Sequence, residues 1–122
     1  MALTIFPSGF AGTLKIIRES DLDETANDNV ADGAATIYAL DIDNAANAAI
    51  TYVKTYNNAD PTVGTTDPEM ILMLTASVRR TFIFRTGNAA HSTALSMAAV
   101  TAAGTAGVTG PTSNVIADIG TG

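Results

Sequence analysis

Residues 35–56, with the sequence ATIYALDIDNAANAAITYVKTY, decide the fold class of this chain. In the first half of this stretch, larger apolar side chains recur at every second position, at Tyr38, Leu40 and Ile42, with small or acidic residues between them. Because successive side chains of a strand point to opposite faces, this alternation predicts a half-buried strand over residues 35–43.

The second half of the stretch predicts another strand, over residues 48–57. Tyr52, Lys54 and Tyr56 fall on one face of this strand, and two threonines and a valine fall on the other. Residues 44–47, Asn-Ala-Ala-Asn, favour a turn. Two strands joined by so short a connection are typical of an antiparallel hairpin, which we expect here.

Further short strands are expected on both sides of this stretch. They cover residues 12–17, 70–74, 78–85, 93–100 and 113–119. The run Met70–Leu74 is apolar throughout, which suits a strand that is buried on both faces or lies at an interface. Alanines over residues 89–103 favour a helix by propensity, but serines, threonines and the lack of a charged face favour a strand.

Together these patterns predict an all-β protein. We expect an antiparallel β-sandwich of about six or seven strands, with an immunoglobulin-like, fibronectin-like or jelly-roll-like arrangement. The chain has 122 residues, which suits a single core and leaves too little for two. Its residues are 47% hydrophobic and only 15% charged, a composition that argues against disorder.

The net charge of −6 is concentrated near the N-terminus. Residues 1–44 contain two basic and eight acidic side chains, whereas residues 45–122 contain four of each. We therefore predict an N-terminal arm over residues 1–33, which orders on contact, and a β-sandwich domain over residues 34–122. The sparsely charged surface of that domain is typical of a protein that contacts a partner.

Several classes of partner and cofactor are not expected. Only six Lys and Arg residues are present, too few for a basic surface that binds nucleic acid. The N-terminus lacks the basic start of a signal peptide, and Pro111 and many polar residues disfavour a membrane helix within the uncharged residues 86–117. Because the chain has no Cys and one His, no disulfide, metal site or other cofactor is expected.

Candidate chemical sites in the sequence are weak. His91 lies in a predicted exposed loop without a nucleophile motif, so we do not expect an enzyme. Asp41 and Asp43 lie two residues apart on one strand face, where two carboxylates could share a calcium ion. The spacing of a calcium-binding loop is missing, and a solvated acidic face is the favoured interpretation.

Arginines and tyrosines are the candidate interaction residues. Arg79 and Arg85 share one face of a predicted strand, and Arg80 lies on the other face with phenylalanines. Arginine suits bidentate contact with carboxylates at an interface, and it equally suits a charged edge strand that discourages uncontrolled pairing. Tyr52 and Tyr56 are candidates for contact with a partner. Together with Tyr38 they could form a sugar-binding platform, although a role in the core or on a sheet face is favoured.

Two segments resemble small virion proteins of tailed bacteriophages. In residues 42–56, IDNAANAAITYVKTY, a strand that ends in Asn turns into a Tyr-x-Lys-x-Tyr strand. Residues 94–113, ALSMAAVTAAGTAGVTGPTS, carry the rest of the resemblance and are also similar to the last hairpin of fibronectin-type-III-like modules. Those modules normally bury a Trp in an early strand, and this chain contains no Trp.

This resemblance implies a structural role on a phage particle. The group includes capsid decoration (cement) proteins, which bind and stabilise the head shell, as well as tail, fibre and head-fibre modules. We expect a decoration protein that is made in the host cytoplasm and binds the major capsid protein on the outer surface of the head. Self-association, for example into a trimer at three-fold positions, is also expected. The alternative is a tail, fibre or head-fibre module that binds a receptor or carbohydrate.

Overall fold

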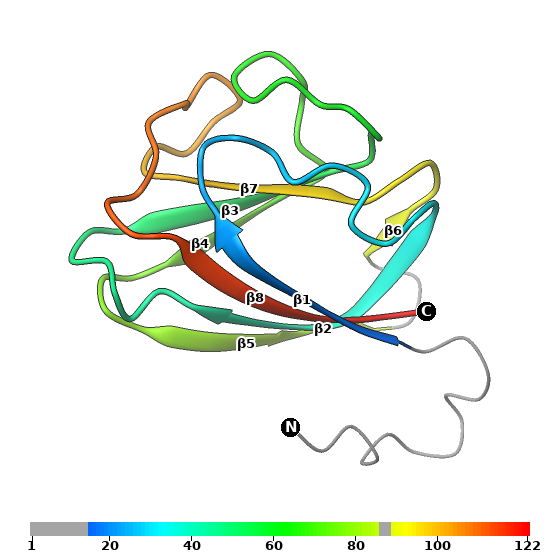
Figure 1. Ribbon diagram of the computed structural model, residues 1–122, viewed down its shortest axis with the longest axis horizontal. Coiled ribbons are helices and arrows are strands. Elements are labelled where there is room, and N and C mark those ends of the chain that lie inside the picture. The colour runs from blue at the N-terminus through cyan, green and yellow to red at the C-terminus, as the bar shows by residue number, and fades with distance from the viewer. Residues whose placement is uncertain (1–14, 86–88) are drawn as a thin grey trace.

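The computed structural model describes residues 15–85 and 89–122, which form two antiparallel β-sheets packed face to face (Figure 1). These residues contain eight strands and no helix, so the predicted all-β sandwich is confirmed. The strands are β1 (Lys15–Leu22), β2 (Ala35–Asp43), β3 (Thr51–Tyr56), β4 (Met70–Leu74), β5 (Arg79–Ile83), β6 (Ala90–His91), β7 (Ser96–Val100) and β8 (Val115–Thr121).

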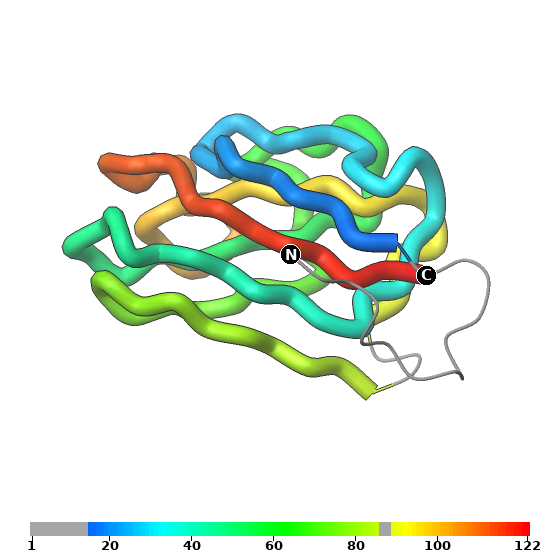
Figure 2. Tube along the Cα trace, turned by 60° about the horizontal axis from the view of Figure 1, so that its bottom comes forward, coloured from blue at the N-terminus to red at the C-terminus, as the bar shows by residue number. Residues whose placement is uncertain are grey.

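The larger sheet has the strand order β1-β8-β2-β5, and the short β6 pairs with the start of β2. The smaller sheet has the order β4-β3-β7. Figure 2 shows the four long strands of the larger sheet side by side, with the smaller sheet behind them. The alanine-rich segment, for which a helix was the competing interpretation, supplies β7 and is a strand as predicted.

The hydrophobic core lies between the two sheets and takes alternate residues from both. Its large, fully buried side chains include Leu40, Ile42, Leu74, Met97 and Ile119. Full burial of one such side chain contributes about 1.5–3 kcal/mol, so this layer is the main source of stability.

The predicted inner face of β2 needs one correction, at Tyr38. The pairing of β2 with β8 shifts register between Ile37 and Ala39, which is the signature of a β-bulge. Ile37 and Leu40 are both fully buried as a result, whereas Tyr38 is only partly buried. Sequence alternation cannot reveal an extra residue of this kind, because the bulge depends on the partner strand.

The expected hairpin between residues 35–43 and 48–57 is wrong. β2 belongs to the larger sheet and β3 to the smaller one, so residues 44–50 cross between the two layers. Asn44 and Asn47 are fully buried in this crossing. The Asn47 Nδ2 donates to Asn44 Oδ1 and to the Ser113 carbonyl, both at 2.9 Å, and the Asn44 Nδ2 donates to the Thr75 carbonyl at 3.1 Å. The two amides therefore tie three connections together instead of turning one hairpin.

Two further expectations about strand placement are corrected. β7 and β8 lie in different sheets, so residues 94–120 do not form the fibronectin-like hairpin that the resemblance implies. β4 is not buried on both faces, because it ends the smaller sheet and leaves Ile71 and Met73 partly exposed. The alternative prediction, that β4 lies at an interface, stays a prediction.

Part of the predicted arm, residues 1–33, belongs to the sandwich. β1 pairs with β8 along the edge of the larger sheet, and Asn27 forms an isolated bridge with Met97 of β7. Residues 15–33 are therefore packed against both sheets. Residues 1–14, the rest of the predicted arm, lie outside the described residues.

Candidate functional site

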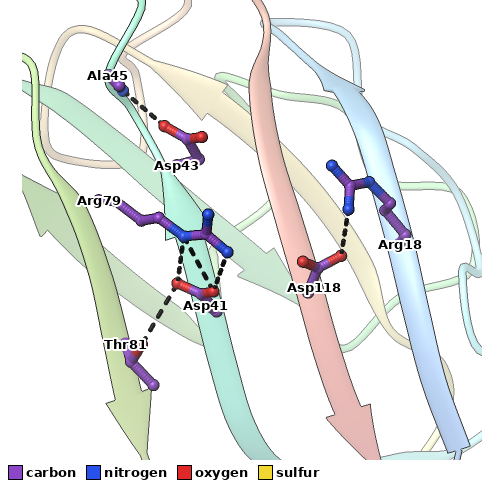
Figure 3. A network of polar contacts seen from close by, with 7 residues as sticks. All are labelled: Arg18, Asp41, Asp43, Ala45, Arg79, Thr81 and Asp118. Atoms are coloured by element: carbon purple, nitrogen blue, oxygen red, sulfur yellow. Dashed lines mark hydrogen bonds and ion pairs between the residues drawn. The ribbon is translucent and has the colours of Figure 1, made fainter. Parts of the chain in front are cut away.

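Charged side chains form a row across the outer face of the larger sheet (Figure 3). Arg18, Asp118 and Asp41 occupy neighbouring register positions on β1, β8 and β2. Carboxylates that lie directly opposite across a strand pair repel one another, and each of these two has an arginine on its outer side. Arg18 Nη1 lies 3.6 Å from Asp118 Oδ1, and Arg79 Nη2 lies 2.6 Å from Asp41 Oδ2. Each negative charge in this row is therefore balanced by an arginine of the same chain.

Arg79, a predicted interaction residue, is engaged by this row. Its Nε and Nη2 both donate to the Asp41 carboxylate, and the Thr81 hydroxyl lies 3.3 Å from the same group. The hydrogen bonds from Arg79 hold the pKa of Asp41 below its usual value. The other carboxylate considered for calcium, Asp43, accepts a hydrogen bond from the Ala45 amide at 2.9 Å. Both carboxylates therefore have partners in the chain itself.

Arg80 and Arg85 lie at the same edge of the larger sheet as Arg79. The Arg80 guanidinium lies 4.8 Å from the centroid of the Phe82 ring, a distance typical of a cation–π contact. Arg85 follows the end of β5 and is exposed. Because β5 ends the larger sheet, the three arginines line an edge strand, which favours the charged-edge interpretation over a carboxylate-binding one.

Tyr52 and Tyr56 lie on β3 in the smaller sheet, so the structure does not bring the five predicted residues into one site. Tyr56 is fully buried, and its hydroxyl has no hydrogen-bond partner among the described residues. Burial raises the pKa of this phenol. A side chain without exposed surface cannot contact a partner, and only Tyr52, which is half-buried, retains that role.

An apolar patch surrounds Tyr52 on the outer face of the smaller sheet. We call it the outer-face patch and define it as Ile50, Tyr52, Ile71 and Met73. Tyr52 and Met73 lie directly opposite each other in the β3–β4 register. Ile50, Ile71 and Met73 are 45%, 38% and 44% exposed, respectively. Clustered exposed apolar side chains commonly mark contact surfaces, and the apolar run of β4 was the signal in the sequence that pointed here.

No family model, curated protein or solved structure matches this chain significantly. Among the described residues, no three His, Asp or Glu side chains lie close enough together to hold a metal ion. None of the described segments is a helix long and apolar enough to cross a membrane.

Sequence analysis missed the role of Lys54, which is fully buried on the face of β3 beside the outer-face patch. Its Nζ donates to three carbonyls of the loop between β7 and β8: Gly104 at 2.6 Å, Gly107 at 3.0 Å and Thr105 at 3.4 Å. Burial lowers the pKa of this amine. Lys54 therefore holds that loop against the outer face of the smaller sheet. The loop covers the part of this face around Lys54, and the outer-face patch beside it stays exposed. The sequence signal that could have indicated this role is the position of Lys54 between Tyr52 and Tyr56, on one face of the strand.

His91 is buried, contrary to the expected exposed loop position. It lies in β6, and its Nδ1 is 3.2 Å from the Ala89 carbonyl while its Nε2 is 2.9 Å from Thr55 Oγ1. Since a carbonyl can only accept, Nδ1 carries the proton, and Nε2 accepts from the threonine hydroxyl. This neutral ring joins the larger sheet to β3, and both His91 and its partner Thr55 are buried.

The buried ring makes stability depend on pH. Burial lowers the pKa of His91, so the unfolded chain takes up a proton near pH 6.5 that the folded chain does not hold. We expect the free energy of unfolding to fall as the pH drops below about 6.5, by at most about 1.4 kcal/mol per pH unit. In urea unfolding between pH 7.5 and pH 5, His91→Gln should show a flatter profile than the wild type. Parallel profiles would contradict this.

Proposed function

We propose that this chain is a capsid decoration protein of a tailed bacteriophage that binds the major capsid protein on the outer surface of the head. The resemblance of residues 42–56 and 94–113 to small virion proteins supports the class of protein. The outer-face patch supports the mode of binding, and it is the observation that carries the proposal: exposed apolar side chains cluster on one flat sheet face.

The distribution of charge favours the same surface for binding. The acidic segment of residues 19–32 begins in β1 and then runs along β7, as the backbone hydrogen bonds between Asn27 and Met97 show. β3 and β4 contain no acidic residue. Burying the patch therefore removes apolar surface from water, and no carboxylate of β3 or β4 opposes binding through its desolvation.

Stabilisation of the shell would follow from binding alone. A protein that binds the assembled shell but not its separated subunits shifts the equilibrium toward the shell by mass action. A copy that contacts two neighbouring subunits would hold them together. Decorated heads should then resist heat and low ionic strength better than bare heads.

Rebinding of the purified chain to stripped heads tests the proposal. We expect the wild type to bind at high copy number and to restore resistance to heat. Ile50→Lys puts a charge into the patch without touching β4, and it should weaken binding about tenfold or more, since burying an unpaired charge is costly. Ile83→Lys is the matched control, because Ile83 is 76% exposed but lies on the larger sheet. It should bind as the wild type does.

Four results would count against this function. Stripped heads that are as heat-resistant as decorated ones would remove the cementing role. Equal binding by Ile50→Lys would place the contact elsewhere. A low copy number confined to the tail or a vertex would support the receptor-binding alternative, as would glycan binding that Tyr52→Ala abolishes.

A further inference from the structure

The edge strands of the two sheets differ in how they are protected from pairing with another chain. β1 and β5 end the larger sheet, and β4 and β7 end the smaller one. An edge strand presents unpaired backbone N–H and C=O groups. Natural proteins cover such edges, interrupt them with bulges or surround them with charged side chains.

The β7 edge is covered by the segment that follows β1. Asn27 and Met97 exchange two backbone hydrogen bonds, at 2.8 and 3.1 Å, and the Ala99 amide donates to the Asp23 carbonyl at 2.8 Å. In Figure 1 this segment, in blue, runs beside β7. No second chain can pair along β7 without displacing it.

The two edges of the larger sheet carry charge. β1 contains Arg18 and Glu19, and its pairing with β8 shifts register between Glu19 and Leu22. β5 contains Arg79 and Arg80, so any chain that pairs along this edge meets two neighbouring arginines. Both edges therefore have features that oppose association.

The five residues of β4 have none of these protective features, and the nearest charged side chain in the sequence is that of Glu69, directly before the strand. Its residues, Met70–Leu74, include no charged side chain and no proline, and its register with β3 is regular along its whole length. Within residues 15–85 and 89–122, no strand pairs with its free side. A regular, apolar and unpaired edge of this kind is a site for strand addition.

We propose that β4 pairs antiparallel with β4 of a second copy of this chain, across a twofold axis at Leu72. In this register Ile71 lies opposite Met73 of the second copy, and Met70 lies opposite Leu74. Every cross-strand pair is then apolar, which favours pairing. The two smaller sheets would join into one continuous sheet, and the two outer-face patches would lie side by side.

Repulsion between two copies is smallest when they meet at this edge. A chain with a net charge of −6 is repelled by its own copy wherever acidic segments meet. The segment of residues 19–32 lies along β7, and β7 and β4 are opposite edges of the smaller sheet. Pairing through β4 therefore keeps the two acidic segments at the far ends of the dimer.

The dimer should be weak in solution. A single strand pair buries less than the roughly 1,200 Å² of a standard interface, and the arginines of β5, which lies on the same side of the sandwich as β4 (Figure 1), would approach those of the second copy. We expect a dissociation constant between about 10 µM and 1 mM. The inference rests on the edge geometry and not on the proposed shell binding, so each can fail without the other.

Sedimentation equilibrium of the full chain up to about 1 mM tests the pairing. The wild type should show a monomer–dimer equilibrium. Ile71→Lys with Met73→Lys places lysines opposite lysines in the proposed register and should raise the dissociation constant about tenfold or more. Ile71→Lys with Met73→Glu places each lysine opposite a glutamate, so this variant should still dimerise, and more weakly as salt is added.

Val108→Lys, an exposed apolar-to-lysine change in the loop between β7 and β8, is the control and should dimerise as the wild type does. Circular dichroism and melting temperatures close to the wild type show that each variant folds. A wild-type chain that stays monomeric or forms trimers would overturn the proposal. So would unchanged dimerisation of the double-lysine variant, or loss of the dimer in the lysine–glutamate variant.

Discussion

Replacing Asn47 by alanine is expected to lower the free energy of unfolding by about 3–4 kcal/mol. The Asn47 side chain is buried and makes four hydrogen bonds: it donates to Asn44 Oδ1 and to the Ser113 carbonyl, and it accepts from the Ser113 amide and from the Thr112 hydroxyl. Alanine leaves these groups without partners, and each unsatisfied buried group costs about 1–3 kcal/mol. The total cost is smaller than the sum of four such penalties, because the exposed Thr112 hydroxyl can bond to water instead.

Urea unfolding of Asn47→Ala and of a matched control measures this effect. Asn58 is the control, because its Oδ1 accepts only the Asp60 amide, at 2.8 Å, in an exposed turn. Asn58→Ala should cost less than about 1 kcal/mol. If the two variants lose equal stability, the buried amides do not hold the three connections together.

Replacing Lys54 by alanine is expected to cost about 3 kcal/mol, mainly through its buried stem. Alanine removes methylene groups, worth about 0.8 kcal/mol each, and releases the carbonyls of Gly104, Thr105 and Gly107. Lys54→Met keeps most of the apolar stem and has no charged group whose burial is unfavourable. It should therefore lower the free energy of unfolding by only about 1 kcal/mol. Lys15→Ala is the control, since Lys15 is exposed and donates to one carbonyl, that of Ala31.

The pH dependence of these variants separates the charge of Lys54 from its packing. Burial lowers the folded pKa below 10.5, so above the folded pKa the unfolded chain holds a proton that the folded chain has lost. Stability from this group therefore rises with pH up to about 10.5. Tyr56 acts in the opposite direction above pH 10, because burial raises its pKa.

The difference between the wild type and Lys54→Met isolates the lysine, since Tyr56 is present in both. In urea unfolding at a series of alkaline pH values, the stability advantage of the wild type should grow with pH. An advantage that stays constant from pH 7 to pH 10.5 would show that the amine titrates normally in the folded chain.

Much of the secondary structure could be predicted from the sequence. Residues 35–43 and 70–74 match β2 and β4 because alternation and apolar runs are local signals. The partners of these strands could not be predicted in the same way. Asn44 and Asn47 suit a tight turn as well as a buried crossing, and only the groups of Thr75 and Ser113, distant in sequence, decide between the two.

The candidate site was predictable to a smaller extent. The apolar run Met70–Leu74 indicated an interface, and its side chains supply half of the outer-face patch. Tyr56 and Lys54 alternate as exposed residues would, yet both are buried because loops cover that part of β3. Burial by a loop depends on tertiary contacts, which a strand pattern cannot show.

The position of β8 between β1 and β2 has a consequence for how the chain acquires its structure. During synthesis, β1 and β2 are made long before β8, and the larger sheet cannot close until β8 enters between them. Contacts between residues so distant in sequence slow folding, because a long loop must close before they form. The edges of β1 and β2 that β8 later covers therefore stay unpaired until β8 is made, and an unpaired edge is where a nascent chain associates with other chains.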